Sequence, residues 1–232
     1  MSDLGVFLCI PAYNEAKRIG AVLGALGELG YPVVVVDDGS VDGTAEVARG
    51  YAVTLLRHEK NRGKGEAIQT ALRYLLGQDA KAVLFLDADG QHLPSEAGRF
   101  MEVWRARRPD MVVGSRMKES GSMPLVRRVS NRFSSGLISV IAGHRITDSQ
   151  SGYRLLSKRM MEFALSRPGG RFGLESELII DAVAAGMSYE EVPISCIYGD
   201  KKSHFHPVLD SLDFTRLVIR KAVERRFGRR QQ

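Results

Sequence analysis

The chain has 232 residues, of which 44% are hydrophobic and 26% are charged. This composition supports one large or two small domains with a buried core, and it excludes a disordered polymer. No apolar segment approaches the roughly 20 residues that a membrane-spanning helix needs. The N-terminus lacks the basic region and long apolar stretch of a secretory signal. We therefore expect a cytoplasmic protein without a signal peptide or transmembrane helix.

The net charge is +6, and basic residues gather near the C-terminus, between Thr215 and Arg230. Such a segment suits nucleic acid, an anionic membrane surface or plain solvation, and the charge leaves all three open. The two cysteines, Cys9 and Cys196, occupy apolar or strand-like positions without metal-ligand spacing. We expect both to be buried free thiols of a reducing compartment.

In the first half of the chain, short apolar runs alternate with amphipathic stretches. The predicted order is strand Val6–Ile10, helix Glu15–Leu29, strand Val33–Val36, helix Thr44–Arg49, strand Val53–Arg57, helix Glu66–Leu76, strand Val83–Asp87, helix Ser95–Arg107 and strand Met111–Gly114. The strands are continuous apolar runs, so both of their faces should be buried, as in a parallel sheet covered by helices.

The second half has a less regular order. It should contain helix Leu125–Ala142, strand Tyr153–Leu156, helix Glu175–Ala185, strand Val192–Ile197 and a long terminal helix Leu209–Phe227. The pattern predicts an α/β fold: a Rossmann-like, mostly parallel central sheet with helices on both faces and an irregular C-terminal third.

Five predicted strands are followed by polar or charged residues. These clusters are Pro11–Glu15, Asp37–Ser40, Asn61–Gly65, Asp87–Gln91 and Gly114–Arg116. Ligands of an open parallel sheet bind beyond the carboxyl ends of its strands. Each cluster alone could be an ordinary loop, but five at one edge predict a binding site.

The cluster that ends the run LFLD contains two aspartates, Asp87 and Asp89. Side chains alternate along a strand, so the two carboxylates would share a side if the extended chain continued. Together with the amide oxygen of Gln91 they suit Mg²⁺ or Mn²⁺, which favour oxygen ligands and fill their shell with phosphate oxygens. The alternative is a helix N-cap followed by solvent-exposed charge.

Gly63, Lys64 and Arg116 supply groups that would neutralise a pyrophosphate, which indicates a nucleotide-diphosphate site. Two other nucleotide sites fail on context. The GxxGxxG pattern at 24–30 lies in or after a helix, whereas the dinucleotide fingerprint directly follows a strand. The Gly-Lys-Gly at 63–65 lacks the Walker pattern.

The motifs PAYNE (11–15), VVVDDGSVDGT (34–44), NRGKGEA (61–67), FLDADGQH (85–92) and VGSR (113–116) occur in this order. In this order and spacing they resemble the family 2 inverting glycosyltransferases of the GT-A fold. DSQSGYR (148–154) is similar to the branch of dolichyl- or polyprenyl-phosphate sugar synthases. The resemblance covers about residues 5–200. It implies a catalytic domain at 1–207, with a nucleotide-sugar half (1–115) and an acceptor half (116–207), and a basic amphipathic tail at 208–232.

The resemblance also implies roles for residues of the first half. The donor nucleotide would contact Pro11, Tyr13, Glu15 and Asp38 through its base and ribose, with Asp37, Gly63, Lys64 and Ala88 supporting it. Asp87, Asp89 and Gln91 match the D-x-D-x-Q motif, which would hold Mg²⁺ or Mn²⁺ against the diphosphate, with Asp89 also acting in catalysis.

In the second half, Arg116, Arg127 and Asn131 match the pocket for the acceptor phosphate, with Arg128 as the alternative to Arg127. The two arginines would act in catalysis, and Asp148 would be the base if the acceptor is a hydroxyl.

The loop IYGDKKSHFHP (197–207) departs from the family pattern of a basic closing loop. Lys202 and His204 are candidate diphosphate contacts within it. A metal pair of His204 and His206, or a plain polar loop, remains open.

The resemblance implies inverting transfer from a nucleotide sugar, with GDP-mannose favoured over UDP-glucose, to a polyprenyl or dolichyl-type phosphate. The alternatives are transfer to a glycan or glycolipid hydroxyl, and a non-catalytic nucleotide-binding scaffold on the membrane. We expect peripheral contact with the cytoplasmic face of a membrane, through Phe133–Ala142 or the basic tail. No nucleic-acid partner is expected, since no recognisable module or interleaved aromatic residues are present.

Overall fold

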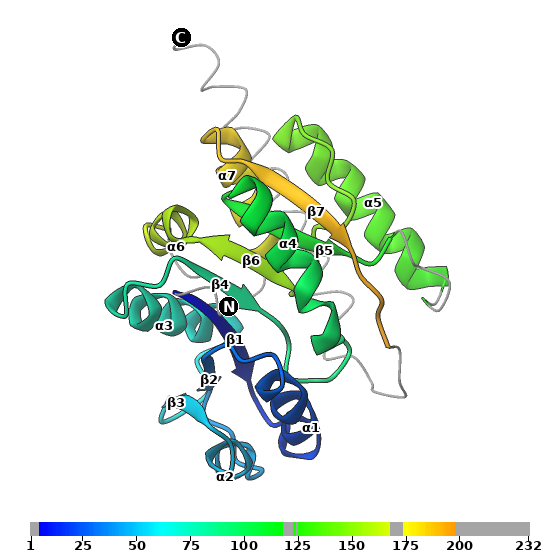
Figure 1. Cartoon of the computed structure of the whole chain (residues 1–232). Coiled ribbons are helices and arrows are strands. Elements are labelled where there is room, and N and C mark those ends of the chain that lie inside the picture. The colour runs from blue at the N-terminus through cyan, green and yellow to red at the C-terminus, as the bar shows by residue number, and fades with distance from the viewer. Residues whose placement is uncertain (1–4, 118–122, 124, 168–173, 198–232) are drawn as a thin grey trace.

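The computed structural model describes residues 5–117, 123, 125–167 and 174–197 (Figure 1). Within them lies a seven-stranded sheet of order β3-β2-β1-β4-β6-β5-β7. Its strands are β1 (Val6–Ala12), β2 (Val33–Asp37), β3 (Val53–Arg57), β4 (Ala82–Phe85), β5 (Met111–Ser115), β6 (Arg154–Ser157) and β7 (Tyr189–Pro193). Only β6 among these is antiparallel to its neighbours, which confirms a mostly parallel α/β sheet.

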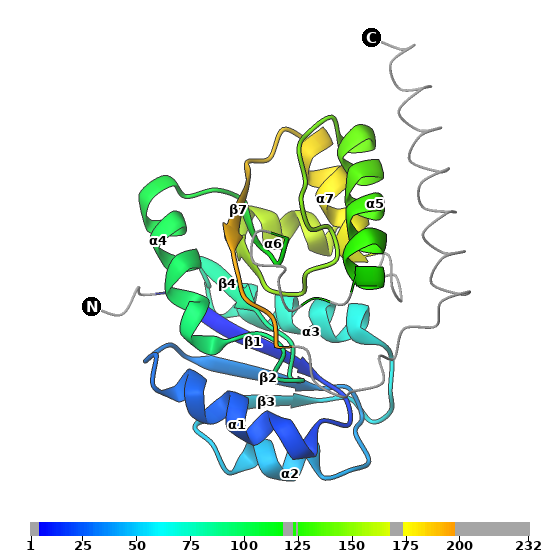
Figure 2. The same cartoon turned by 90° about the vertical axis from the view of Figure 1, so that its right-hand side faces the viewer.

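Helices cover both faces of this sheet (Figures 1 and 2). The first face carries α1 (Ala16–Gly27), α2 (Thr44–Arg49) and α4 (Ala97–Arg107). The opposite face carries α3 (Lys64–Gly77), α5 (Leu125–Ala142), α6 (Lys158–Leu165) and α7 (Leu174–Ala184). A short 3-10 turn, η1 (Pro94–Glu96), precedes α4.

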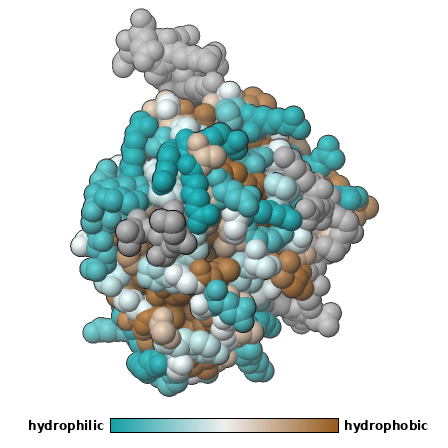
Figure 3. Space-filling model, viewed as in Figure 1, coloured by the Kyte–Doolittle hydropathy of each residue, from teal (hydrophilic) through white to brown (hydrophobic). Residues whose placement is uncertain are grey.

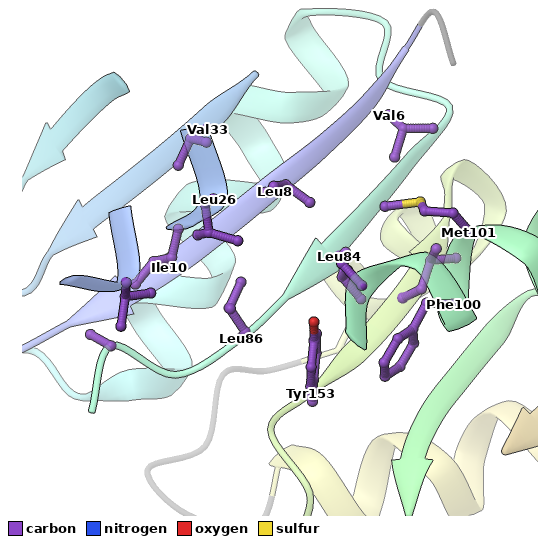
Figure 4. Packing of buried hydrophobic residues seen from close by; sticks show 14 of the residues in the cluster. Val6, Leu8, Ile10, Leu26, Val33, Leu84, Leu86, Phe100, Met101 and Tyr153 are labelled. Carbon is purple, nitrogen blue, oxygen red and sulfur yellow. The ribbon is translucent and has the colours of Figure 1, made fainter. Parts of the chain in front are cut away.

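Strand β1 shows why the apolar runs are continuous. Val6, Leu8 and Ile10 belong to the core under α1 and α4, whereas Cys9 belongs to the core on the other face. All four side chains are completely buried. Because neither face of the strand meets water, no polar position is left in the run. Figure 4 shows this packing around Leu8.

Most predicted elements match observed ones within a few residues, but three differ. The strand predicted at Val192–Ile197 overlaps the observed strand but its bounds are wrong, because β7 runs from Tyr189 to Pro193. Its Glu190 pairs with the Arg107 guanidinium, and its Glu191 accepts hydrogen bonds from Thr147. Because these partners lie far away in the sequence, the local pattern did not predict a strand that contains two glutamates.

The other two differences are a helix and a strand end. Helix α6 was not predicted; it is capped by Ser157, whose hydroxyl accepts from the backbone N–H of Met160 at 3.1 Å. Strand β4 ends at Phe85, before the predicted Asp87. A turn follows in which Gly90 has φ +74°, so strand alternation does not continue to Asp89. The predicted helix Leu209–Phe227 lies outside the described residues.

The direction of β6 decides which segments meet at the ligand edge. Strands β1 to β5 share one direction, so their carboxyl ends lie at one edge of the sheet. Strand β6 runs the other way, and its first residue, Arg154, pairs with Phe85 at the carboxyl end of β4. The segment 148–153, which precedes β6, therefore reaches the same edge as the five predicted polar clusters.

The surface mixes hydrophilic and apolar residues, and the two cysteines lie inside the protein. Hydrophilic residues cover much of the face in Figure 3, with apolar patches between them. Among the described residues, no helix has both the length and the hydropathy for crossing a bilayer. Cys9 and Cys196 are buried, and neither forms a disulfide within the described part of the chain, as predicted.

A methyl group at Gly114 of β5 should destabilise the fold. It would lie 2.7 Å from Ile194 Cδ1 and 2.9 Å from Phe100 Cζ, and both of these side chains are fully buried. We expect Gly114→Ala to lower the free energy of unfolding by about 1–3 kcal/mol, a usual overpacking cost. Urea denaturation followed by Trp104 fluorescence measures this change.

The matched control is Gly98→Ala, at an exposed position of helix α4 where the added methyl meets no atom within 4 Å. It should stabilise the protein by up to about 1 kcal/mol through helix propensity. Equal unfolding free energies for the two variants would contradict close packing at Gly114.

Candidate active site

The turn after β1 and the loop after β2 are locked together by hydrogen bonds. Asn14, in the left-handed region at φ +54°, donates its backbone N–H to Ser40 Oγ at 2.9 Å. Its side-chain oxygen accepts from the Val41 N–H at 3.0 Å. The Glu15 N–H donates to Thr44 Oγ1 at 2.9 Å. The motifs PAYNE and DDGSVDGT therefore form one structural unit at the ligand edge.

The predicted nucleotide contacts in the first turn differ in accessibility. Tyr13 is 43% exposed, so its ring can meet a ligand. Glu15 is buried, and its carboxylate pairs with Arg18 Nη1 at 3.0 Å. Pro11 is half-buried and lines a pocket described below.

Asp37 braces the loop after β2. Its carboxylate is completely buried, accepts from the Ser40 N–H at 3.1 Å and pairs with Arg57 Nε at 3.0 Å. Two positions after Asp37, Gly39 has φ +72°, and a Cβ there would lie 2.4 Å from the carbonyl carbon of Lys60. Only glycine fits this approach of two loops.

Asp38 holds the loop before α3. It accepts from the backbone N–H groups of Arg62 at 2.9 Å and Gly63 at 2.7 Å. His58 Nδ1 lies 2.7 Å from the same carboxylate, and His58 Nε2 lies 2.9 Å from Thr70 Oγ1. The structure thus shows Asp38 positioning the loop that leads to Lys64.

His58 was absent from the predicted site, although it is buried and bonded to Asp38. The available signal was its place directly after β3 and just before the NRGKG motif. The sequence around His58 does not point to its partner, because Asp38 follows a different strand, β2, and lies 20 residues earlier in the chain.

Lys64 and Asp87 form an ion pair at the ligand edge of the sheet, beyond the central strand β4. Lys64 Nζ lies 2.7 Å from Asp87 Oδ1, and His92 Nε2 lies 3.5 Å from Asp87 Oδ2. Partial burial alone would raise the pKa of Asp87, but the charge of Lys64 and the contact with His92 outweigh it and hold that pKa below its usual range. Asp87 is therefore ionised at neutral pH.

The D-x-D-x-Q segment offers oxygen donors for a cation. Asp87, Asp89 and Gln91 are all partly exposed, and the Gln91 N–H donates to Asp89 Oδ1 at 3.0 Å. The described residues contain no group of three or more His, Cys, Asp or Glu side chains suited to a metal ion. This donor set still fits Mg²⁺ or Mn²⁺, since such ions use one or two carboxylates and complete their shell with phosphate oxygens and water.

Gly152 makes room for Asp87, which the sequence interpretation missed. A Cβ at Gly152 would lie 2.5 Å from Asp87 Oδ2 and 2.9 Å from Oδ1. The Asp87 carboxylate therefore rests against the backbone of the 148–153 segment. The glycine in DSQSGYR was visible, but its neighbour depends on the reversed direction of β6.

Asp148 organises the predicted acceptor pocket. It is completely buried and accepts from Arg116 Nε at 2.7 Å, Arg116 Nη2 at 2.8 Å and Asn131 Nδ2 at 3.0 Å. Burial would raise the pKa of Asp148, but the hydrogen bonds and charge of Arg116, with the help of Asn131, hold it below its usual range. An ionised carboxylate with these partners is a weak base and a strong anchor for Arg116.

Arg127 and Arg128 lie in the first turn of α5, upstream of Asn131 on the same helix. The side chain of Arg127 is outside the described residues, and so are Lys202 and His204. These predicted contacts therefore stay predictions.

Buried bonds also hold the 148–154 segment, which leads from Asp148 to Gly152. The guanidinium of Arg154 donates to the carbonyl oxygens of Ser151 and Ser149. The Ser149 N–H donates to Ser135 Oγ of α5 at 3.0 Å. These bonds tie down the segment that joins the Arg116 cluster (Arg116, Asn131 and Asp148) to Gly152, which lies against Asp87.

A small pocket opens beside Asp87. Its lining combines charged and polar positions of the edge with apolar residues of the core beneath α3 and α7: Pro11, Lys64, Ile68, Phe85, Leu86, Asp87, Gly152, Arg154, Leu156 and Leu178. Of the predicted nucleotide and metal residues, Pro11, Lys64 and Asp87 line this pocket.

The amino-acid sequence is similar to a protein family and to several named proteins. The family description "Glycosyl transferase family 2" matches residues 7–164. The UDP-N-acetylglucosamine–dolichyl-phosphate N-acetylglucosaminyltransferase of Methanococcus voltae is 35% identical over 222 residues, covering 85% of this chain and 88% of that protein. The undecaprenyl-phosphate mannosyltransferase of Micrococcus luteus is 29% identical over 205 residues, covering 83% of each chain.

The fold also matches a solved structure, glucosyl-3-phosphoglycerate synthase from Mycobacterium tuberculosis in complex with Mn²⁺, UDP and glucosyl-3-phosphoglycerate. The TM-score is 0.69 at 18% identity, and the match covers 95% of this chain and 79% of that one. At this identity the likeness shows the shared fold, the GT-A arrangement.

Gly152→Ala should move the Asp87 carboxylate, because the new methyl would lie 2.5 Å from Oδ2. We expect the affinity for Mn²⁺ in the presence of UDP or GDP to fall about tenfold, because changes to the groups that position a metal ligand usually weaken metal binding by about this factor. Electron paramagnetic resonance titration of Mn²⁺ measures it. Gly27→Ala, which meets no atom within 4 Å, is the control. An unchanged Mn²⁺ affinity in Gly152→Ala would show that Asp87 tolerates the methyl group.

Asp148→Asn should destabilise the protein, since it leaves the Arg116 guanidinium without its carboxylate. The expected loss is about 3–5 kcal/mol near neutral pH, as for breaking a buried ion pair. The folded pKa of Asp148 is lowered, so its stabilisation is present above the unfolded value of about 3.9 and disappears as pH falls through the folded pKa. Urea unfolding of both proteins across pH measures this difference.

The gap between wild type and Asp148→Asn should therefore shrink as the pH is lowered below about 4. A gap that stays constant over that range would mean that Asp148 is not ionised in the folded protein.

Proposed function

Because the chain belongs to glycosyl transferase family 2, we propose that it transfers a sugar from a nucleotide sugar to the phosphate of a polyprenyl or dolichyl-type lipid. The observation that carries the acceptor class is the Arg116 guanidinium held by buried Asp148 beside the donor edge. Relatives named as dolichyl- and undecaprenyl-phosphate sugar transferases support the same class.

The proposed donor site is formed by Lys64 and by the turn after β1 and the loop after β2, which are joined by hydrogen bonds. The exposed Tyr13 ring and the unit formed by the two turns would receive the base and ribose. Lys64, which forms an ion pair with Asp87 in this structure, would supply a positive charge to the donor diphosphate. A divalent cation bound by Asp87, Asp89 and Gln91 would neutralise charge that develops on the leaving diphosphate. The solved structure that shares the fold contains Mn²⁺.

The acceptor side needs position and charge more than a base. A phosphate monoester is already anionic near neutral pH, so its oxygen can attack the anomeric carbon without losing a proton first. Asp148, with its lowered pKa, is poorly suited to deprotonate a hydroxyl. Arg116, fixed by two of its nitrogens, would hold the incoming phosphate in line with the donor. This arrangement favours phosphate over a glycan hydroxyl.

The identity of the sugar is the finest part of the proposal. The motif resemblance favours mannose from GDP-mannose over glucose from UDP-glucose. One relative is named for transfer of N-acetylglucosamine from UDP-N-acetylglucosamine, and another for transfer of mannose. The donor test therefore has to include all three nucleotide sugars.

The direct test incubates the full chain with each labelled nucleotide sugar, Mg²⁺ or Mn²⁺, and a short polyprenyl phosphate. We expect a product that is extractable into organic solvent and labile to mild acid. Product formed only with a hydroxyl acceptor would overturn the lipid-phosphate assignment. Nucleotide binding without transfer to any acceptor would support the scaffold alternative.

Arg116→Lys should separate charge from geometry. Lysine keeps the positive charge but cannot make the bidentate contact with Asp148. We expect kcat/KM for the lipid phosphate to fall at least about tenfold, with unchanged affinity for the nucleotide.

The matched control for Arg116→Lys is Arg159→Lys. Arg159 also pairs with a buried aspartate, Asp110, at 3.0 Å, but at the start of α6, at the other end of β6 from the site. Equal loss of activity in both variants would contradict a specific role for Arg116.

A further inference from the structure

Helix α5 carries an unusual exposed apolar face. Leu125, Val126, Val129, Phe133 and Val140 are 64%, 82%, 60%, 72% and 74% exposed. Most of the other large apolar side chains in the described part of the chain are buried or half-buried. Contiguous exposed apolar surface marks a contact with a partner or a membrane.

The spacing of these residues gives the helix two different faces. Val126, Val129, Phe133 and Val140 follow the pattern i, i+3, i+7, i+14, which places them along one side. Asn131, on the opposite side, is buried and bonds to Asp148. The inner face thus builds the Arg116 cluster, while the outer face offers apolar groups to the surroundings.

Basic residues flank the apolar stripe. The sequence of α5, LVRRVSNRFSSGLISVIA, contains three arginines and no acidic residue. Arg132 is exposed next to Phe133, and exposed Arg145 follows the helix. An amphipathic helix with an apolar face and arginines beside it is typical of segments that lie in the interface of an anionic bilayer.

A second copy of the chain fits this face less well. At about 1.5 Å per residue, the helix is roughly 27 Å long, and a stripe about 10 Å wide offers only a few hundred Å². A stable dimer buries about 800 Å² on each partner. The stripe also bears repelling positive charge on both copies, whereas an anionic lipid surface complements it.

We propose that the outer face of α5 binds the surface of an anionic lipid bilayer, with Phe133 and its valine neighbours at the headgroup level. Figure 1 shows α5 at the margin of the molecule, and the side chains of its outer face are exposed. Binding would bring the Arg116–Asp148–Asn131 cluster to the membrane, where a lipid phosphate resides. The benefit to catalysis rests on the proposed function, but vesicle binding itself requires no turnover.

The test is co-sedimentation of the full chain with vesicles of phosphatidylcholine alone or mixed with phosphatidylglycerol. Wild type should bind the anionic vesicles, and added salt should weaken binding. Val129→Gln/Phe133→Gln should bind about tenfold less, with an unchanged thermal unfolding curve because both positions are exposed. Val41→Gln, at a position 87% exposed in the loop after β2, is the control and should bind as wild type does.

Other occupants of the face give distinct results. Full vesicle binding by Val129→Gln/Phe133→Gln, with loss of binding in Arg225→Gln/Arg226→Gln/Arg229→Gln/Arg230→Gln, would assign the membrane contact to the basic C-terminal segment and overturn the proposal. Absence of vesicle binding together with a dimer in solution that Val129→Gln/Phe133→Gln dissociates would assign the face to a second copy and also overturn it.

A paired activity assay keeps this proposal separate from the proposed function. Val129→Gln/Phe133→Gln should keep its activity on a short, water-soluble polyprenyl phosphate and lose activity on the same headgroup embedded in vesicles. If no lipid phosphate is a substrate, vesicle binding by wild type and its loss in the variant still support the membrane contact alone.

Discussion

The buried Asp148 carboxylate joins three parts of the chain that are distant in sequence. It accepts hydrogen bonds from Arg116 after β5 and from Asn131 on α5, while it begins the segment that leads to β6. A buried charge persists only when it is paired and hydrogen-bonded, so removing either partner disturbs all three elements. The position of the proposed acceptor cluster of Arg116, Asn131 and Asp148 depends on these bonds.

A second buried carboxylate plays a similar part on the donor side. Asp38 bonds to two backbone N–H groups of the loop before α3 and to His58. The loop thereby presents Lys64 to Asp87. In both halves of the candidate site, a buried carboxylate thus holds a neighbouring segment of the chain in place.

The two halves meet where Gly152 touches Asp87. The segment between Asp148 and Gly152 is fixed by Arg154 and by Ser135. Because it is tied down inside the protein, the distance between acceptor cluster and donor edge is built into the fold. In-line transfer between two phosphates benefits from such fixed spacing, since it depends on positioning more than on proton transfer. The apolar outer face of α5 belongs to the same helix that carries Asn131, so the proposed membrane contact and the proposed acceptor pocket share one helix.

The sequence by itself determined the α/β class, most strand positions in the first half, the family, and the polar clusters of the ligand edge. It could do so because parallel strands buried on both faces need continuous apolar runs, and their carboxyl ends gather at one edge. Only the tertiary structure decided that β6 runs in reverse and brings Gly152 to Asp87. It also decided that Asp38 holds a loop, that His58 is its partner, and that two glutamates lie within β7. Each of these depends on a contact between residues far apart in the chain, and local periodicity carries no record of such partners.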